Sequence, residues 1–170
     1  NFGENLLSKN NNEKAITFIS ENGFREERSW KKLNLNTASI VGFLKENKIR
    51  KGDRIAAYMP NCIETVEAFL ATTSIGGIWS SCSPDFGVTG VIERFFQIKP
   101  KVLFITDQYF YNGKKINIIE RLSKILELIP TIKNVVIINY PGERFIKYNK
   151  KFKNQRLSKW TDFIKKNPKE

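Results

Sequence analysis

The residue types that most often carry out catalysis are unevenly represented in this chain. None of its 170 residues is a histidine, which excludes a Ser-His-Asp triad, a Cys-His pair and a histidine-ligated metal within it. A general acid or base would have to be a carboxylate, lysine, tyrosine or cysteine. The two cysteines, Cys62 and Cys82, form no CxxC pair. We therefore expect no metal site, and a location in the reducing cytoplasm.

Glycine loops that bind phosphate are also absent, because neither GxGxxG nor GxxxxGK[ST] occurs. Polar residues gather instead at three places where strands are expected to end: at Asn61, at residues 83–87 and at residues 107–115. Ligands of parallel α/β sheets bind outside the carboxyl ends of the strands. These three segments are therefore the candidate binding segments.

Alternating strand and helix patterns must position these segments. The chain opens with a predicted β-hairpin of residues 15–20 and 25–30, in which Asn22-Gly23 supplies the positive φ angles of a tight turn. Apolar runs then predict strands at 54–59, 78–82, 102–106 and 135–138. Helical spacing predicts helices at 37–48, 61–75, 88–99 and 117–129, with a last short helix around 157–164.

Two helices carry a capping-box pattern at their predicted starts. Asn61 precedes Glu64 by three residues, and Asn117 precedes Glu120 in the same way. Apolar strands that alternate with helices indicate a parallel sheet covered on both faces. The predicted fold class is therefore α/β, a β-hairpin followed by a doubly wound, mostly parallel sheet.

The net charge of +12 is concentrated near the end of the chain. Residues 144–170 hold ten Lys or Arg but only two acidic residues, and residues 143–170 form a basic end with weaker periodicity. The chain is also rich in Lys, Asn and Ile together, so drifted surface composition explains the charge better than nucleic-acid binding does. No apolar run approaches the ~20 residues that cross a bilayer. We expect neither a nucleic-acid nor a membrane partner.

Five motifs occur in register in the first 140 residues: NFGENLL at 1–7, KGDR at 51–54, YMPN at 58–61, SIGGIWSSCSPDFG at 74–87 and YNGK at 111–114. Together they resemble the front of the adenylate-forming acyl-CoA synthetases. The WSSxSPDFG string followed by YNGK is similar to the acetoacetyl-CoA synthetase branch. Acetyl- and propionyl-CoA synthetases have a different string there, typically ending in GGFS.

The resemblance implies a ligase that joins an acid, most specifically acetoacetate, to CoA. ATP and the acid would form an acyl-adenylate and pyrophosphate, and CoA would then displace AMP, with Mg²⁺ expected in the full-length enzyme. The chain, residues 1–170, would be a partial amino-terminal AMP-binding domain, because the family's phosphate loop, adenine-binding stretch, hinge aspartate and mobile lysine are missing from it. We therefore expect no catalytic residue and no activity from this piece alone.

The resemblance also implies an edge of the CoA site. Residues 83–87 match the loop that lies against the CoA nucleotide in short-chain relatives. Residues 111–114 match a segment where acetyl-CoA synthetases use two arginines around the ribose phosphate, replaced here by Tyr111 and Lys114. A lysine remains a point-charge phosphate partner without the bidentate fork. The implied CoA-binding residues are Ser83, Pro84, Asp85, Phe86, Gly87, Tyr111, Asn112, Gly113 and Lys114.

Ordinary structural roles compete with these assignments. Asp85 could cap the following helix, Phe86 could belong to the core, and Lys114 could be a solvated surface lysine. Trp79 is expected to pack against the sheet and Cys82 to act as a small apolar residue.

Arg94 matches a family arginine on the helix that follows residue 87, and a salt bridge is the favoured role for it.

For the chain as a whole, three alternatives stay open. They are an acetyl- or propionyl-CoA synthetase piece, a stand-alone CoA-binding domain without turnover, and a nucleic-acid-binding module.

Overall fold

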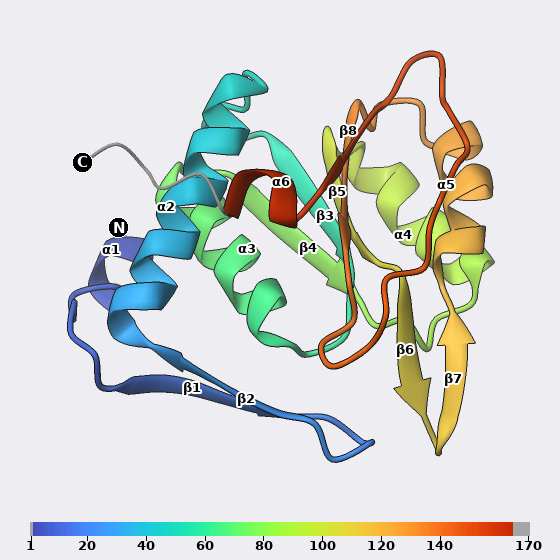
Figure 1. Ribbon diagram of the computed structural model, residues 1–170. Coiled ribbons are helices and arrows are strands. Elements are labelled where there is room, and N and C mark those ends of the chain that lie inside the picture. The colour runs from blue at the N-terminus through green and yellow to red at the C-terminus, as the bar shows by residue number, and fades with distance from the viewer. Residues whose placement is uncertain (1, 165–170) are drawn as a thin grey trace.

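A five-stranded parallel sheet forms the centre of the protein (Figure 1). The computed structural model describes residues 2–164. The sheet has the order β4-β3-β5-β8-β9, and every neighbouring pair in it is parallel. Its strands are β3 (Arg54–Tyr58), β4 (Ile78–Cys82), β5 (Val102–Thr106), β8 (Asn134–Ile138) and β9 (Arg156–Lys159). This architecture confirms the predicted α/β class.

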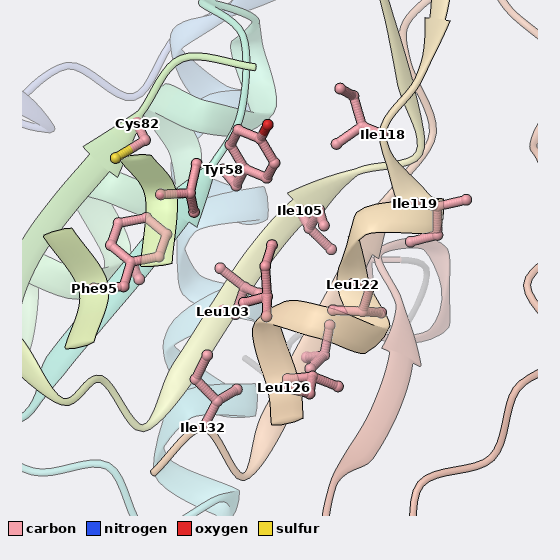
Figure 2. Packing of buried hydrophobic residues seen from close by; sticks show 14 of the residues in the cluster. Tyr58, Cys82, Phe95, Leu103, Ile105, Ile118, Ile119, Leu122, Leu126 and Ile132 are labelled. Atoms are coloured by element: carbon pink, nitrogen blue, oxygen red, sulfur yellow. The ribbon is translucent and has the colours of Figure 1, made fainter. Parts of the chain in front are cut away.

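Helices cover both faces of the sheet (Figure 1). Alternate residues of a strand point to opposite faces, so Ile55 and Ala57 of β3 join one core while Ala56 and Tyr58 join the other. The first core contains side chains of α2 (Trp30–Glu46), α3 (Ile63–Ser74) and α6 (Thr161–Ile164). The second contains side chains of α4 (Val88–Ile98) and α5 (Leu122–Leu128), and Figure 2 shows Tyr58, Phe95, Leu103 and Leu126 packed together there.

The amino-terminal segment is anchored to this body by one buried carboxylate. Helix α1 (Phe2–Leu6) precedes the antiparallel hairpin β1 (Lys14–Ile19) and β2 (Arg25–Ser29). Arg28 Nε of the hairpin donates to Glu67 Oε1 at 2.9 Å, and Asn36 Nδ2 of α2 donates to the same oxygen at 2.8 Å. Burial raises the pKa of Glu67 to about 7, and the Arg28 charge opposes that rise. The base of the hairpin is therefore fixed to α2 and α3.

The predicted strands of the sheet were all found, but several helix starts were wrong. Helix α3 has Cys62 as its N-cap with no side-chain hydrogen bond, so Asn61 does not open it. Asn117 ends a strand instead of starting a helix: a 3₁₀ turn, η1 (Ile119–Arg121), comes first and α5 follows it. The Asn117 amide still donates to Glu120 at 2.7 Å. Helix α2 begins well before residue 37, because Ser29 accepts from the Lys32 amide as its N-cap.

Four further elements were not predicted, and the first of them along the chain is the short helix α1. Strand β9 lies in the basic end of the chain and takes the first part of the region predicted as the last helix, so only α6 at residues 161–164 is helical there. Strands β6 (Gln108–Tyr111) and β7 (Lys114–Asn117) form a second antiparallel hairpin where a loop was expected. Among the described helices, none is both long and apolar enough to span a membrane.

Candidate functional site

The strand order fixes where a ligand site should lie. Strand β3 has β4 on one side and β5 on the other, so the chain changes direction across the sheet at β3. Open α/β sheets bind ligands outside the carboxyl ends of their strands at such a switch point. A hollow of about 270 Å³ lies there, and its lining includes Met59 and Pro60 after β3, Ser83 and Asp85 after β4, and Tyr111 of β6.

The 83–87 loop, which leads from β4 into α4, is held by its backbone carbonyls. Tyr58 Oη donates to Phe86 O at 2.6 Å. Arg121 Nη1 donates to Pro84 O and Phe86 O, each at 3.1 Å, and also to the Tyr58 hydroxyl. Burial raises the pKa of Tyr58, and Arg121 opposes that rise. Two side chains distant in sequence therefore fix the path of this loop.

The carboxylate of Asp85 is satisfied inside the site. Ser83 Oγ donates to Asp85 Oδ2 at 2.7 Å, and Tyr109 Oη donates to Asp85 Oδ1 at 2.8 Å. Burial raises the pKa of Tyr109, and the hydrogen bond to Asp85 raises it further. The Tyr109 contact joins the 83–87 loop to the hairpin β6–β7 across the hollow.

Asp107 holds the base of that hairpin at the end of β5. It is completely buried, and its side chain accepts from the Tyr140 amide at 2.9 Å and the Ile146 amide at 2.8 Å. Its backbone carbonyl accepts from the amides of Ile118 and Ile119. Burial raises the pKa of Asp107, while the backbone donors lower it. The hairpin and the loop after β8 therefore share one buried anchor.

The 111–114 turn forms the outer end of the hairpin and lies at the surface. Tyr111 is 56% exposed, and Asn112 and Gly113 have φ angles of 51° and 70°. The side chain of the exposed Lys114 makes no hydrogen bond or ion pair within residues 2–164. The turn therefore presents one uncommitted ammonium group beside the hollow.

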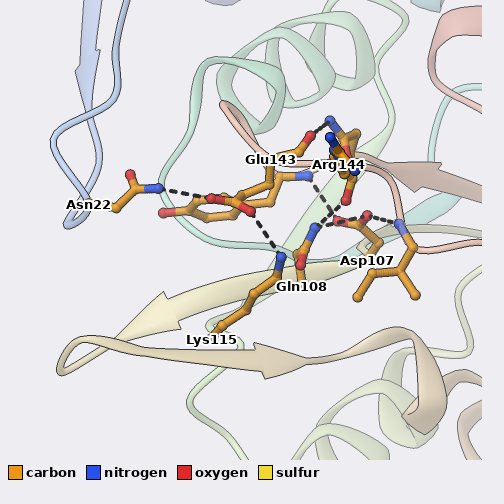
Figure 3. A network of polar contacts seen from close by, with 9 residues as sticks. Asn22, Asp107, Gln108, Lys115, Glu143 and Arg144 are labelled. Carbon is orange, nitrogen blue, oxygen red and sulfur yellow. Dashed lines mark hydrogen bonds and ion pairs between the residues drawn. The ribbon is translucent and has the colours of Figure 1, made fainter.

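Carboxylates from two other segments hold the turn in place. The amides of Asn112 and Gly113 donate to the two oxygens of Glu21, at 3.0 and 3.3 Å. Glu143, which follows β8, accepts from Lys115 Nζ at 2.9 Å and from Asn22 Nδ2 at 3.1 Å (Figure 3). The turns of both hairpins and the loop after β8 are thus tied together by surface contacts.

Comparison with known proteins identifies the family of this chain. The model of the family described as AMP-binding enzyme matches residues 5–169. The chain belongs to the AMP-binding enzyme family.

Within the AMP-binding enzymes, this chain is similar to acetoacetyl-CoA synthetases. The chain is 42% identical over 142 residues to an acetoacetyl-CoA synthetase of Xenopus tropicalis. The matched region covers 82% of this chain and 21% of that protein. It is 41% identical over 145 residues to the acetoacetyl-coenzyme A synthetase of Rhizobium meliloti, covering 84% of this chain and 22% of the relative. The chain thus spans about a fifth of the length of these relatives.

A solved structure supports the same likeness. The acetoacetyl-CoA synthetase from Streptomyces lividans superposes with a TM-score of 0.86 at 29% sequence identity. The match covers 99% of this chain and 25% of the other. The described fold is therefore that of a portion of an adenylate-forming ligase.

The CoA-binding residues that the resemblance implies fall into two groups. Ser83, Pro84, Asp85 and Tyr111 line the hollow together. The remaining five, which do not line it, are Phe86, Gly87, Asn112, Gly113 and Lys114.

The ordinary roles weighed for single residues had mixed outcomes. Asp85 does not cap α4, whose N-cap is Gly87. Phe86 is 38% exposed instead of lying in the core, and Arg94 lies 4.3 Å from its ring centroid as a cation–π pair in place of the expected salt bridge. Trp79 packs between Phe69 and Phe104, as expected.

Sequence reasoning missed the residues that hold the site. Tyr58, Arg121 and Tyr109 act on the 83–87 loop, and Glu21 and Glu143 act on the turn. The Tyr-x-Tyr alternation of 109 and 111 was a usable strand signal, but nothing in the sequence marks Arg121 or Glu21. Within residues 2–164, no group of three or more Cys, Asp or Glu side chains could hold a metal ion.

Proposed function

We propose that this chain is part of an acid–CoA ligase that converts acetoacetate, ATP and CoA into acetoacetyl-CoA, AMP and pyrophosphate. The observation that carries it is the hollow at the switch point of the sheet, lined by Ser83, Asp85 and Tyr111. The names of the relatives supply the substrate class, since three of them are acetoacetyl-CoA synthetases.

The reaction divides into two steps, formation of an acyl-adenylate and transfer of the acyl group to CoA. The carboxylate of the acid attacks the α-phosphate of ATP, so that pyrophosphate leaves and an acyl-adenylate forms. The CoA thiol then attacks the acyl carbon, and AMP leaves. Mg²⁺ would accompany the ATP phosphates in the whole enzyme, where residues outside the described part would hold it. The role of the present residues is to bind and orient CoA.

Each half of the candidate site offers CoA a different kind of contact. The 83–87 loop presents a rigid wall, because its carbonyls and the Asp85 carboxylate already have partners. The 111–114 turn presents the Lys114 ammonium, which would pair with the phosphate on the CoA ribose as a point charge. Tyr111, 56% exposed, offers a ring face on which adenine could stack.

The acyl substrate is the finer part of this assignment. Acetyl- or propionyl-CoA synthesis is the main alternative, and residues 79–87 argue against it by their sequence. If the whole protein released pyrophosphate with acetate or propionate but not with acetoacetate, the acetoacetate assignment would be wrong. Both cysteines are free, which fits a cytoplasmic enzyme. The proposed function involves small-molecule substrates, and we propose neither a nucleic-acid nor a membrane partner.

Calorimetry with CoA tests the binding role directly. We expect CoA to bind the 170-residue chain, and Lys114→Ala to weaken the binding about fivefold, the scale of one exposed charge contact. Dephospho-CoA, which lacks the ribose phosphate, should bind both proteins alike. Lys124→Ala is the matched control, because Lys124 is an exposed lysine on α5. Equal CoA affinities for the wild type and Lys114→Ala would contradict the assigned contact.

A further inference from the structure

The turn of the hairpin β6–β7 has two backbone donors that the hairpin cannot use. Tyr111 pairs with Lys114 across the hairpin, so Asn112 and Gly113 are its two turn residues. Both have positive φ angles, 51° and 70°, as in the two-residue turns that suit hairpins. Their N–H groups lie beyond the last rung of the ladder. Successive amides in such a conformation form a concave site for an anion.

A carboxylate of the same chain already occupies this anion site. Glu21 comes from the turn of the hairpin β1–β2, 91 residues earlier than Asn112. Each of its oxygens accepts from one amide, at 3.0 Å from Asn112 N and 3.3 Å from Gly113 N. The side chains at this contact are exposed. The two free donors of the turn are therefore taken by an internal anion at the surface.

We propose that Glu21 stands in for a phosphate monoester and must leave the turn before that phosphate can bind it. After Glu21 has left, the phosphate site would consist of the amides of Asn112 and Gly113 and the ammonium of Lys114. Identifying the phosphate as the one on the CoA ribose rests on the proposed function. The exchange of Glu21 for a phosphate does not.

The contacts around the turn favour exchange over permanent support by Glu21. The hydrogen bonds from the two amides to Glu21 are exposed, and water competes for such groups, so their net contribution is modest and Glu21 can be displaced. The turn would remain in place without it, because Lys115 pairs with Glu143 and Glu143 also binds Asn22 (Figure 3). A phosphate dianion has more charge and more acceptor oxygens than a carboxylate. It can also pair with Lys114, which has no partner within residues 2–164.

Nuclear magnetic resonance of the ¹⁵N-labelled chain reports on the two amides individually. Inorganic phosphate is titrated into the wild type, Glu21→Gln and Glu21→Ala, with chloride titrated at matched ionic strength. Glu127→Gln controls for the lost charge, because Glu127 is an exposed carboxylate on α5. Glu143→Gln loosens the same turn while leaving Glu21 in place.

We expect both Glu21 variants to bind phosphate about fivefold more tightly than the wild type, with the largest shifts at Asn112 and Gly113. Glu127→Gln should match the wild type, and Glu143→Gln should show no gain in affinity. If the Glu21 variants show no tighter binding, or if Glu143→Gln gains as much as they do, the exchange is wrong.

The same titrations with CoA separate this inference from the proposed function. If the Glu21 variants gain phosphate affinity but no protein binds CoA, the exchange stands and the CoA assignment fails. If CoA and inorganic phosphate each bind the wild type and the Glu21 variants equally, the CoA assignment stands and the exchange fails. Tighter binding of CoA, with no gain for dephospho-CoA, supports both.

Discussion

The 83–87 loop and the 111–114 turn border the same hollow but are held in opposite ways. The loop is fixed from within the fold, because Tyr58 of β3 and Arg121 donate to its carbonyls. The turn is fixed from outside, by Glu21 on its amides and by Glu143 on the neighbouring Lys115. One half of the site rests on the core and the other on exposed charges.

This difference assigns a different task to each half. The loop contacts come from the buried Tyr58 and the half-buried Arg121, which also bind each other. Hydrogen bonds that share partners in this way reinforce one another, so the loop acts as a fixed wall. Exposed ionic contacts are worth little and exchange readily with solvent and ligands. The turn can therefore change partners without disturbing the sheet. Substitutions in the loop should lower stability, whereas substitutions at the charges of the turn should mainly change anion binding.

Replacing Arg121 should have the largest effect of the substitutions that test this contrast. Arg121→Met removes three donated hydrogen bonds and leaves Pro84 O and Phe86 O with Tyr58 alone. We expect the free energy of unfolding to fall by about 2 kcal/mol, measured by urea denaturation. Arg121→Lys keeps one charged donor nitrogen, so its free energy of unfolding should lie between those of the wild type and Arg121→Met. An unchanged unfolding midpoint for Arg121→Met would mean that the loop is not held from within.

How far the site was predictable depends on the range of its contacts. The segments 83–87 and 111–114 could be proposed from sequence because each comes after a predicted strand and carries a motif of the family resemblance. Arg121 was not found, because it acts on carbonyls 35 and 37 residues away. Its role depends on how η1 and the following α5 pack against the sheet, which local patterns do not specify. The same is true of Glu21, whose partners are 91 and 92 residues away.

In the fold, too, elements with a local sequence pattern were predicted and elements that depend on distant contacts were missed. Strands β3, β5 and β8 were predicted from apolar runs, because a strand buried on both faces must be apolar. The edge strand β9 has the sequence RLSK, in which only Leu157 is apolar, so no run marks it. The start of α2 was missed because its first turns carry Asn34 and Asn36, which are poor helix formers. Asn36 is placed there by its hydrogen bond to the buried Glu67.

Removing the Tyr109 hydroxyl tests a contact between the 83–87 loop and the hairpin that carries the turn. Tyr109→Phe deletes the hydrogen bond to Asp85 and should lower the free energy of unfolding by about 1.5 kcal/mol at pH 7. Asp85 keeps its bond from Ser83, so the variant should still fold. Ser83→Ala, which removes the other donor, is the companion measurement.

The Tyr109 contact should also depend on pH in a definite direction. Burial raises the pKa of Tyr109 above its ordinary value of 10.0. Its stabilising contribution is therefore complete below pH 10 and is lost as the pH rises above that value. The advantage of the wild type over Tyr109→Phe should shrink between pH 10 and pH 11.5, in denaturation at each pH. A constant advantage across this range would contradict the assigned contact.

Two glycines test whether backbone conformation distinguishes the loop from the turn. A Cβ atom built at Gly87 or at Gly113 would meet nothing within 4 Å, so neither substitution creates a clash. Gly87 has a φ angle of −60°, which alanine adopts freely, whereas Gly113 has a φ angle of 70°. Gly113→Ala should therefore lower the free energy of unfolding by about 1 kcal/mol, and Gly87→Ala should change it by less than about 0.5 kcal/mol. If both alanine variants lost the same stability, the positive φ angle of the turn would not be what sets these two positions apart.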